Sequence, residues 1–181
     1  TISVLSAFQE KVKLTAFEFF SDIALKHVCK HRSLAKPVQT SSAYYVLLEC
    51  EKSEQVHEAF EDCVAKGWVI DGVLGASEAQ RAQLWQYREG ISESITPFTP
   101  YKNDLSVRVS DVPQFLAAAE ACVGERYPGF EIVWFGHIGD GNLHLNILKP
   151  ASLAVAEFKA QCEQVSEEVL GIVADFDGSV S

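Results

Sequence analysis

The sequence predicts an α+β domain, in which one antiparallel sheet has helices packed on one face and a polar surface on the other. Stretches with helical spacing of apolar residues alternate with short runs of strand-forming residues. The dipeptide Asp140-Gly141, set between alternating apolar residues, predicts a β-hairpin. The 181 residues are 48% hydrophobic and 22% charged, which is enough to bury one sizeable core.

The expected elements follow one another along the whole chain. Strand formers predict strands at 43–50, 68–75, 101–109, 131–137 and 142–148. Apolar residues at helical spacing predict helices at about 15–32, 53–66, 77–95, 111–127 and 152–174. Ser53 is placed to cap the second helix, and Gly67 to end it. This order resembles two split βαβ halves, so we expect a ferredoxin-like sheet.

Composition excludes several classes of function. The formal net charge of −10 argues against nucleic acid and anionic membranes as partners. No apolar run approaches the roughly 18 residues that a membrane span needs. The five cysteines are dispersed without a Cys-x-x-Cys pair, which favours a reducing compartment and buried thiols over disulfides or a zinc–cysteine site. The sequence lacks methionine and begins at Thr1, so we expect a fragment of a longer protein.

The hairpin carries the most specific chemistry. If Asp140-Gly141 forms a two-residue turn, His137 lies directly opposite His144, with Cβ atoms roughly 4.5–5.5 Å apart. The two-residue period adds Asn142 and Asn146 to that face. Two facing imidazoles can bind one divalent metal. The alternative is a pair of polar histidines on the solvated face of a sheet.

A second set of residues could bind a carboxylate. Arg88 and Ser92 lie four residues apart on one helix, so a guanidinium and a hydroxyl would be neighbours. Lys102 begins a strand after a proline-rich turn. The alternatives are an Arg88 paired with a nearby glutamate on a solvated helix, and a surface lysine neutralised by Asp104.

Taken in order, these segments resemble the C-terminal domain of the FAD-linked oxidases related to vanillyl-alcohol oxidase. The resemblance covers essentially the whole chain. Within that family the sequence is most similar to the branch of D-2-hydroxyglutarate dehydrogenases, D-lactate dehydrogenases and the glycolate oxidase flavoprotein subunit. The segments that carry it are Leu14–Phe19, Tyr44–Glu49, Leu84-Trp85, Arg88-Glu89, Ile91–Glu93, Tyr101–Ser106, Gly136–Ile147 and Gly178–Ser181.

The resemblance implies a function and a set of site residues. Members oxidise a D-2-hydroxy acid and pass a hydride to FAD, which a separate N-terminal domain holds; residues 1–181 would be the substrate-binding cap domain. His137 and His144 would be the catalytic metal ligands, most simply for zinc, and the family's third ligand follows the Gly-Ser-Val-Ser run. Substrate contacts would come from Arg88, Ser92, Lys102 and Asn146. We expect the fragment alone to be inactive and to bind metal weakly.

Two other functions stay open: a metal-dependent hydrolase that uses the two histidines, and a non-catalytic binding or assembly module. For the dehydrogenase, the expected partners are a small 2-hydroxy acid and an electron acceptor that is a protein or a quinone. We expect neither nucleic acid nor a membrane span, and allow for a homodimer. The expected location is the cytoplasm, or the mitochondrion if the source is eukaryotic.

Overall fold

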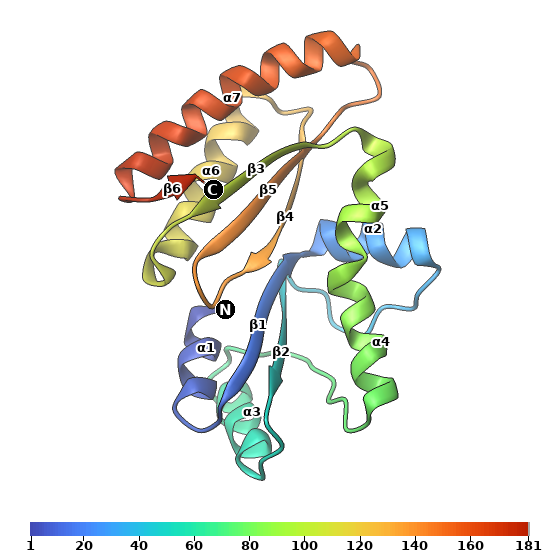
Figure 1. The fold of residues 1–181 in the computed structure, drawn as a ribbon, viewed down its shortest axis with the longest axis vertical. Helices are drawn as coiled ribbons and strands as arrows, with labels where there is room; N and C mark the ends of the chain where they lie inside the picture. Colours follow the sequence, from blue (N-terminus) through green and yellow to red (C-terminus); the bar gives the residue numbers. More distant parts are fainter. Residues whose placement is uncertain (181) are drawn as a thin grey trace.

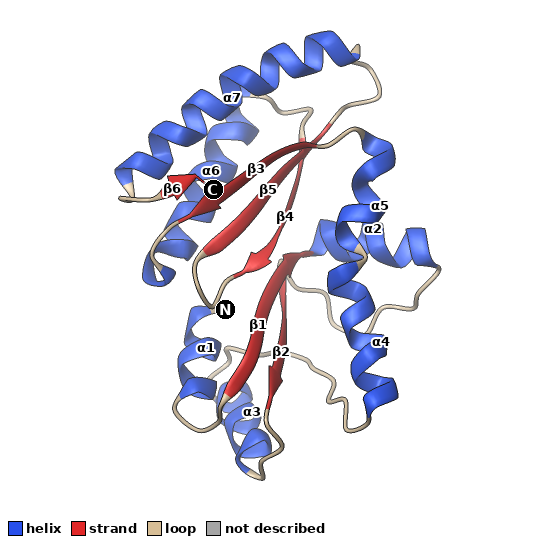
Figure 2. Cartoon of the chain, viewed as in Figure 1, coloured by secondary structure: helices blue, strands red, loops and turns tan. Residues whose placement is uncertain are grey.

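The computed structural model describes residues 1–180, which form a six-stranded antiparallel sheet with seven α-helices (Figures 1 and 2). The strand order is β2-β1-β4-β5-β3-β6. The strands are β1 (Leu14–Ser21), β2 (Tyr44–Cys50), β3 (Tyr101–Ser106), β4 (Glu131–His137), β5 (Asn142–Leu148) and β6 (Ser179–Val180). The helices are α1 (Ile2–Gln9), α2 (Asp22–Arg32), α3 (Gln55–Ala65), α4 (Glu78–Glu89), α5 (Ile91–Ile95), α6 (Val112–Arg126) and α7 (Val155–Asp175).

The second half of the chain is a ferredoxin-like unit. It runs β3-α6-β4-β5-α7-β6, and its strands lie in the order β4-β5-β3-β6. Both helices, α6 and α7, pack on the same face of these strands, where they bury Phe115, Phe158 and Val169. The predicted α+β class and antiparallel ferredoxin-like sheet are therefore confirmed.

The first half of the chain extends this sheet at the edge formed by β4. Strand β1 meets β4 through two register pairs, Phe19 with Gly136 and Phe20 with Phe135, and β2 then pairs along the length of β1. Figure 1 shows β1 and β2 as one group of strands below β3, β4 and β5. The sheet thus consists of a C-terminal unit and an N-terminal extension that join at a short seam.

Helices cover both faces of the sheet, whereas the sequence pattern predicted helices on one face and a polar surface on the other. α1 and α3 lie on the face that α6 and α7 cover, and together they enclose the larger core. α2, α4 and α5 lie on the opposite face, where Leu25, Ile91 and Ile95 pack against Phe135 and other apolar residues of β1 and β4. The remainder of that opposite face stays open, and Lys102 and Asp104 of β3 are exposed there.

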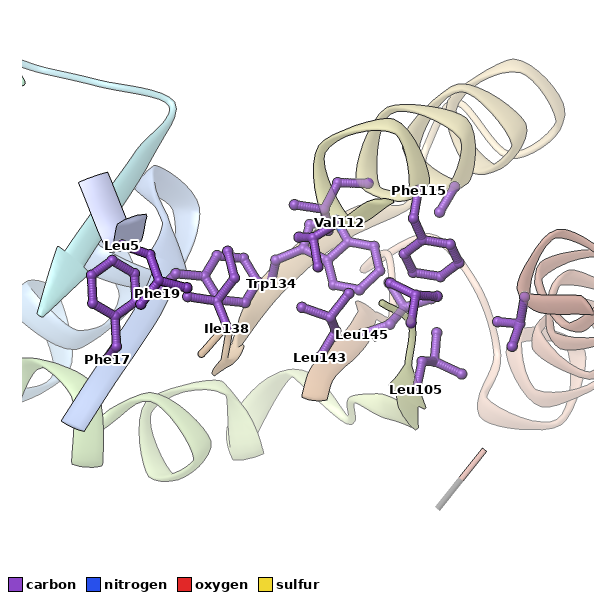
Figure 3. Close-up of a cluster of buried hydrophobic side chains, with 14 of the residues drawn as sticks. Leu5, Phe17, Phe19, Leu105, Val112, Phe115, Trp134, Ile138, Leu143 and Leu145 are labelled. Atoms are coloured by element: carbon purple, nitrogen blue, oxygen red, sulfur yellow. The ribbon is translucent and has the colours of Figure 1, made fainter. Parts of the chain in front are cut away.

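The larger core follows the alternation of the hairpin strands. Leu143, Leu145 and Ile147 of β5 are fully buried on one face, as the two-residue period predicts. Figure 3 shows Leu143 and Leu145 beside Trp134, with Phe115 of α6 above them. Phe17 and Phe19 of β1 continue this cluster across the seam, so one apolar core spans both halves of the sheet.

Two predicted elements are wrong. Residues 15–21 belong to strand β1, because alternation places Phe17 and Phe19 in the larger core and Phe20 in the opposite cluster. The following helix begins only after Ser21, whose hydroxyl accepts a hydrogen bond from the amide of Ala24 at 3.3 Å.

The second is the strand predicted at 68–75, which is a loop without a strand partner among the described residues. Asp71 holds this loop by accepting hydrogen bonds from the amides of Gln39 and Thr40. Ile70, Val73 and Leu74 are more than half exposed, whereas Val69 of the same run packs against the larger core. The short elements α1 and β6 had no prediction.

The composition led to expectations about the cysteines and about membrane-spanning helices. All five cysteines are free thiols, and Cys63 and Cys162 are buried. In the part of the chain that the structure describes, none of the helices combines the length and the apolar character that crossing a membrane requires.

Candidate functional site

The hairpin between β4 and β5 brings the two histidines to one face, but not in the predicted register. His137 lies opposite Asn142, and His144 lies opposite Phe135. The prediction that the two histidines face each other directly is therefore wrong. The shift in pairing is two residues, which preserves the face that each side chain occupies. The rings still meet diagonally, with centroids 5.8 Å apart and planes at 81°.

The register follows from a loop that is two residues longer than the expected turn. Ile138 is fully buried in the larger core instead of pairing across the hairpin. The amide of Asp140 then donates to the carbonyl of His137 at 3.1 Å, and Gly141 closes the loop with a φ of +78°. A glycine suits this left-handed conformation because it carries no Cβ. Because Ile138 is buried in the core, each residue of β5 pairs with a residue of β4 two positions earlier than predicted.

Glu18 is the centre of the site, and it is not among the site residues that the sequence predicts. It is 5% exposed in β1, and its two carboxylate oxygens have different partners. Oε2 accepts from Nε of Arg88 at 2.8 Å, and Oε1 lies 2.7 Å from Nδ1 of His137. One buried carboxylate therefore joins a cation on α4 to the first of the two histidines.

His144 has a similar partner. Its Nδ1 lies 2.5 Å from a carboxylate oxygen of Asp104, which stands opposite it on β3. A carboxylate can only accept, so each histidine that faces one carries a hydrogen on Nδ1, and the neutral form of the ring then has its lone pair on Nε2. Histidines that bind metal commonly have this arrangement, in which a carboxylate orients the ring from behind.

The described residues around the two histidines offer few ligands for a divalent metal. The centroids of the His137 and His144 rings are 5.8 Å apart, and the Nε2 atoms of these rings are nitrogen ligands of the kind that zinc binds. Beside them, Asn142 Oδ1 is buried and accepts no hydrogen bond within residues 1–180. No group of three or more His, Cys, Asp or Glu side chains in those residues is placed to hold a metal ion. The described residues therefore offer a metal two nitrogen ligands, one fewer than the three protein ligands of a catalytic zinc site.

Arg88 is largely buried, contrary to the alternative of a solvated helix surface. Its side chain is 11% exposed, and its guanidinium lies 4.9 Å from the centroid of the Phe135 ring. Burial lowers the pKa of Arg88 from its usual value, and the charge of Glu18 opposes that shift. The glutamate that pairs with Arg88 is thus Glu18 on the sheet, while Glu93 pairs with Arg32.

Two other expected substrate contacts lie side by side on the sheet. Lys102 and Asn146 are register partners on β3 and β5, beside the pair of Asp104 and His144. Lys102 is exposed and has no ion-pair partner in the described part of the chain. Asn146 is 1% exposed and donates to the carbonyl of Val133 at 3.4 Å. We refer to the sheet surface that carries Glu18, Lys102, Asp104, His137, His144 and Asn146 as the polar face.

Ser92 is not brought into contact with Arg88. α4 ends at Glu89, and Ser92 lies on the separate short helix α5. Its side chain is exposed, and its hydroxyl makes no hydrogen bond within residues 1–180. Its role in carboxylate binding stays a prediction, as do the roles of the other residues of the site.

Comparison with known proteins agrees with this picture of the domain. The family model for the C-terminal domain of FAD-linked oxidases matches residues 2–181. The chain is 53% identical, over 98% of its length, to a D-2-hydroxyglutarate dehydrogenase of Stutzerimonas stutzeri, of which it covers 39%. It is 48% identical over 99% of its length to the enzyme of that name from Xanthomonas citri pv. viticola, again covering 39%. The mitochondrial D-2-hydroxyglutarate dehydrogenase of Bos taurus is 37% identical over 76% of the chain, which covers 26% of that protein. The chain thus spans about two fifths of the length of the two bacterial relatives.

Proposed function

This chain belongs to the family of C-terminal domains of FAD-linked oxidases, and we propose from that premise that it is the substrate-binding domain of an FAD-dependent D-2-hydroxy acid dehydrogenase. Three relatives that share this region are named D-2-hydroxyglutarate dehydrogenase. The parent protein would oxidise the C2 hydroxyl of a D-2-hydroxy acid to a ketone and pass the electrons to a protein or quinone acceptor.

The observation that supports this proposal is the composition of the polar face. Cations suited to a carboxylate, Arg88 and Lys102, flank two imidazoles that carboxylates hold in one tautomer. A 2-hydroxy acid presents a carboxylate and a hydroxyl on adjacent carbons, and the polar face offers partners for both groups. The cations would bind the acid, and the imidazole edge would meet the hydroxyl.

The charges on the polar face favour a dicarboxylate. The charges of Glu18 and Asp104 balance those of Arg88 and Lys102, so these four residues contribute no net charge. A divalent ion on the Nε2 atoms of His137 and His144 would polarise the substrate hydroxyl and leave two positive charges in the site. Two charges match the dianion of 2-hydroxyglutarate better than the single charge of lactate or glycolate. FAD, bound by the remainder of the parent, would accept the hydride from C2.

Two different functions have less support. A metal-dependent hydrolase would use the same two nitrogen ligands and needs a third protein ligand and an open water position, so the histidines alone do not distinguish it from the dehydrogenase. A non-catalytic module would not need Glu18 and Arg88 buried as an ion pair beside an imidazole, because the desolvation of such a pair gives little net stability. The family match also favours the dehydrogenase over both.

The test uses the full-length parent protein with its FAD. We would add D-2-hydroxyglutarate, D-malate, D-lactate and glycolate without oxygen, and follow the loss of flavin absorbance. The proposal expects bleaching by at least one of them, most rapidly by D-2-hydroxyglutarate. The double variant His137→Ala/His144→Ala should lose the reaction. His57→Ala, on the exposed side of α3, is the matched control and should bleach like the parent. A parent that holds FAD but reacts with none of the four acids would overturn the proposal.

A further inference from the structure

We propose that Glu18 is a positioning residue that couples the binding of the substrate carboxylate at Arg88 to the binding of metal at His137. The inference rests on the function proposed above, because it assigns a role within the same site. It concerns a residue that the sequence pattern did not single out and that touches neither substrate nor metal.

The coupling rests on the sharing of one buried carboxylate. The side chain of Glu18 is 7% exposed, and the distances from its two oxygens to Arg88 and His137 are 2.8 and 2.7 Å. A charge removed from water to this extent requires partners, and here both oxygens have one. The three residues come from β1, α4 and β4, so the carboxylate joins elements that are far apart in the sequence.

The contact determines which atoms of His137 and Arg88 remain available. On His137, the carboxylate holds the hydrogen on Nδ1 and leaves the lone pair of Nε2 for a metal. On Arg88, it occupies Nε, which leaves the two terminal nitrogens for a substrate carboxylate. The Phe135 ring, 4.9 Å from the guanidinium, limits the movement of Arg88 further. A change in Glu18 must therefore affect both neighbours.

Asp104 provides an internal comparison. It also accepts from the Nδ1 of a histidine, but its side chain is 52% exposed and the structure shows no arginine beside it among the described residues. Loss of its charge should weaken the metal site alone. Glu93, which is 62% exposed and pairs with Arg32, is a suitable control for the loss of a glutamate charge outside the site.

The experiment compares Glu18→Gln, Asp104→Asn and Glu93→Gln in the full-length holoenzyme. An amide has one acceptor oxygen where the carboxylate has two, so Glu18→Gln keeps only one of the two acceptor positions that Arg88 and His137 use. Zinc affinity is measured by titration of the metal-stripped protein, without turnover. KM for D-2-hydroxyglutarate is then measured at saturating zinc. Glu18→Gln should weaken zinc binding by about 10–100-fold and raise KM by at least about tenfold. Asp104→Asn should weaken zinc binding with a much smaller change in KM, and Glu93→Gln should change neither.

Other outcomes would overturn the inference. If Glu18→Gln changes only one of the two quantities, or neither, the carboxylate does not couple them. If this variant does not fold or loses FAD, Arg88→Lys takes its place. It keeps the charge but removes Nε, and the coupling predicts weaker zinc binding although Arg88 is not a metal ligand. Unchanged zinc affinity in Arg88→Lys would then refute it. The zinc titration needs no substrate, so failure of the proposed reaction is a separate result.

Discussion

Gly136 is a position where the addition of one methyl group should disturb the site. It lies in β4 next to His137 and pairs with Leu143 of β5. A Cβ at this position would stand 2.3 Å from the carbonyl oxygen of Asn142 and 3.0 Å from the Cα of Leu143. Cβ atoms do not approach other atoms within 3.0 Å, so the strands must shift by at least about 0.7 Å in Gly136→Ala.

The size of that shift sets the expected effect. Overpacking of this kind costs about 1–3 kcal/mol, and here the opposing atoms belong to the backbone and cannot turn away. The strained segment also carries His137, and a misplacement near 1 Å costs on the order of 100-fold in rate. We therefore expect Gly136→Ala to lower the midpoint of thermal unfolding and to slow flavin reduction by 10–100-fold, on the order that such a misplacement implies.

Gly139 supplies the matched control. It lies in the same hairpin, and a Cβ there would first meet Phe17 at 3.5 Å, an ordinary contact. Gly139→Ala should therefore keep the stability and the rate of the parent. Stopped-flow reduction of the flavin and thermal unfolding of both full-length variants give the comparison. If Gly136→Ala matches Gly139→Ala in both measurements, the close approach of β4 and β5 does not hold His137 in place.

Three further predictions concern other parts of the domain. Lys102→Gln removes an exposed cation of the polar face. KM for D-2-hydroxyglutarate should rise by about 10–100-fold, and the thermal stability should stay unchanged. The control Lys159→Gln, at an exposed position of α7, should change neither quantity. Leu145→Ala, at a fully buried position, should lower the free energy of unfolding by about 2–5 kcal/mol in denaturant titrations. Leu170→Ala, at a position 41% exposed, should cost less than about 0.5 kcal/mol. Hydrogen bonds from Trp85 and Arg81 lower the pKa of Glu49 below its ordinary 4.5. The ionised carboxylate therefore stabilises the fold above that pH, and this contribution is lost as the pH falls. The thermal unfolding midpoints of the parent and Glu49→Gln should differ at pH 7 and converge toward pH 3.

Local patterns predict the hairpin strands well, because β5 alternates apolar and polar residues and β4 is a short apolar run shortly before Asp140-Gly141. The bounds of β4 and β5 agree with prediction to the residue, and Leu143, Leu145 and Ile147 occupy the predicted face. The register could not be derived in this way. Whether Ile138 pairs across the hairpin or enters the core depends on contacts with other elements, and its complete burial settles the loop at four residues.

The strand β1 was missed because its sequence satisfies two periods at once. Phe17 and Phe20 are three residues apart, as on one side of a helix, while Phe17 and Phe19 fit the alternation of a strand. The error concealed Glu18, which a helix would have placed on a solvated side. A lone acid among four apolar positions was nevertheless a signal, because a carboxylate buried in a strand requires a partner.

The place of Glu18 in the fold explains why no local pattern could show the complete site. The ferredoxin-like unit supplies Lys102, Asp104 and the two histidines, and the N-terminal extension supplies Glu18 and Arg88. The two halves meet at the short pairing of β1 with β4, where Phe20 lies opposite Phe135. The contact of Glu18 with His137 is one of the polar links between the two halves, and it lies on the polar face. The extension therefore serves the site as well as the sheet: without β1 and α4, the two imidazoles would keep Asp104 but lose the buried carboxylate and the cation that it holds.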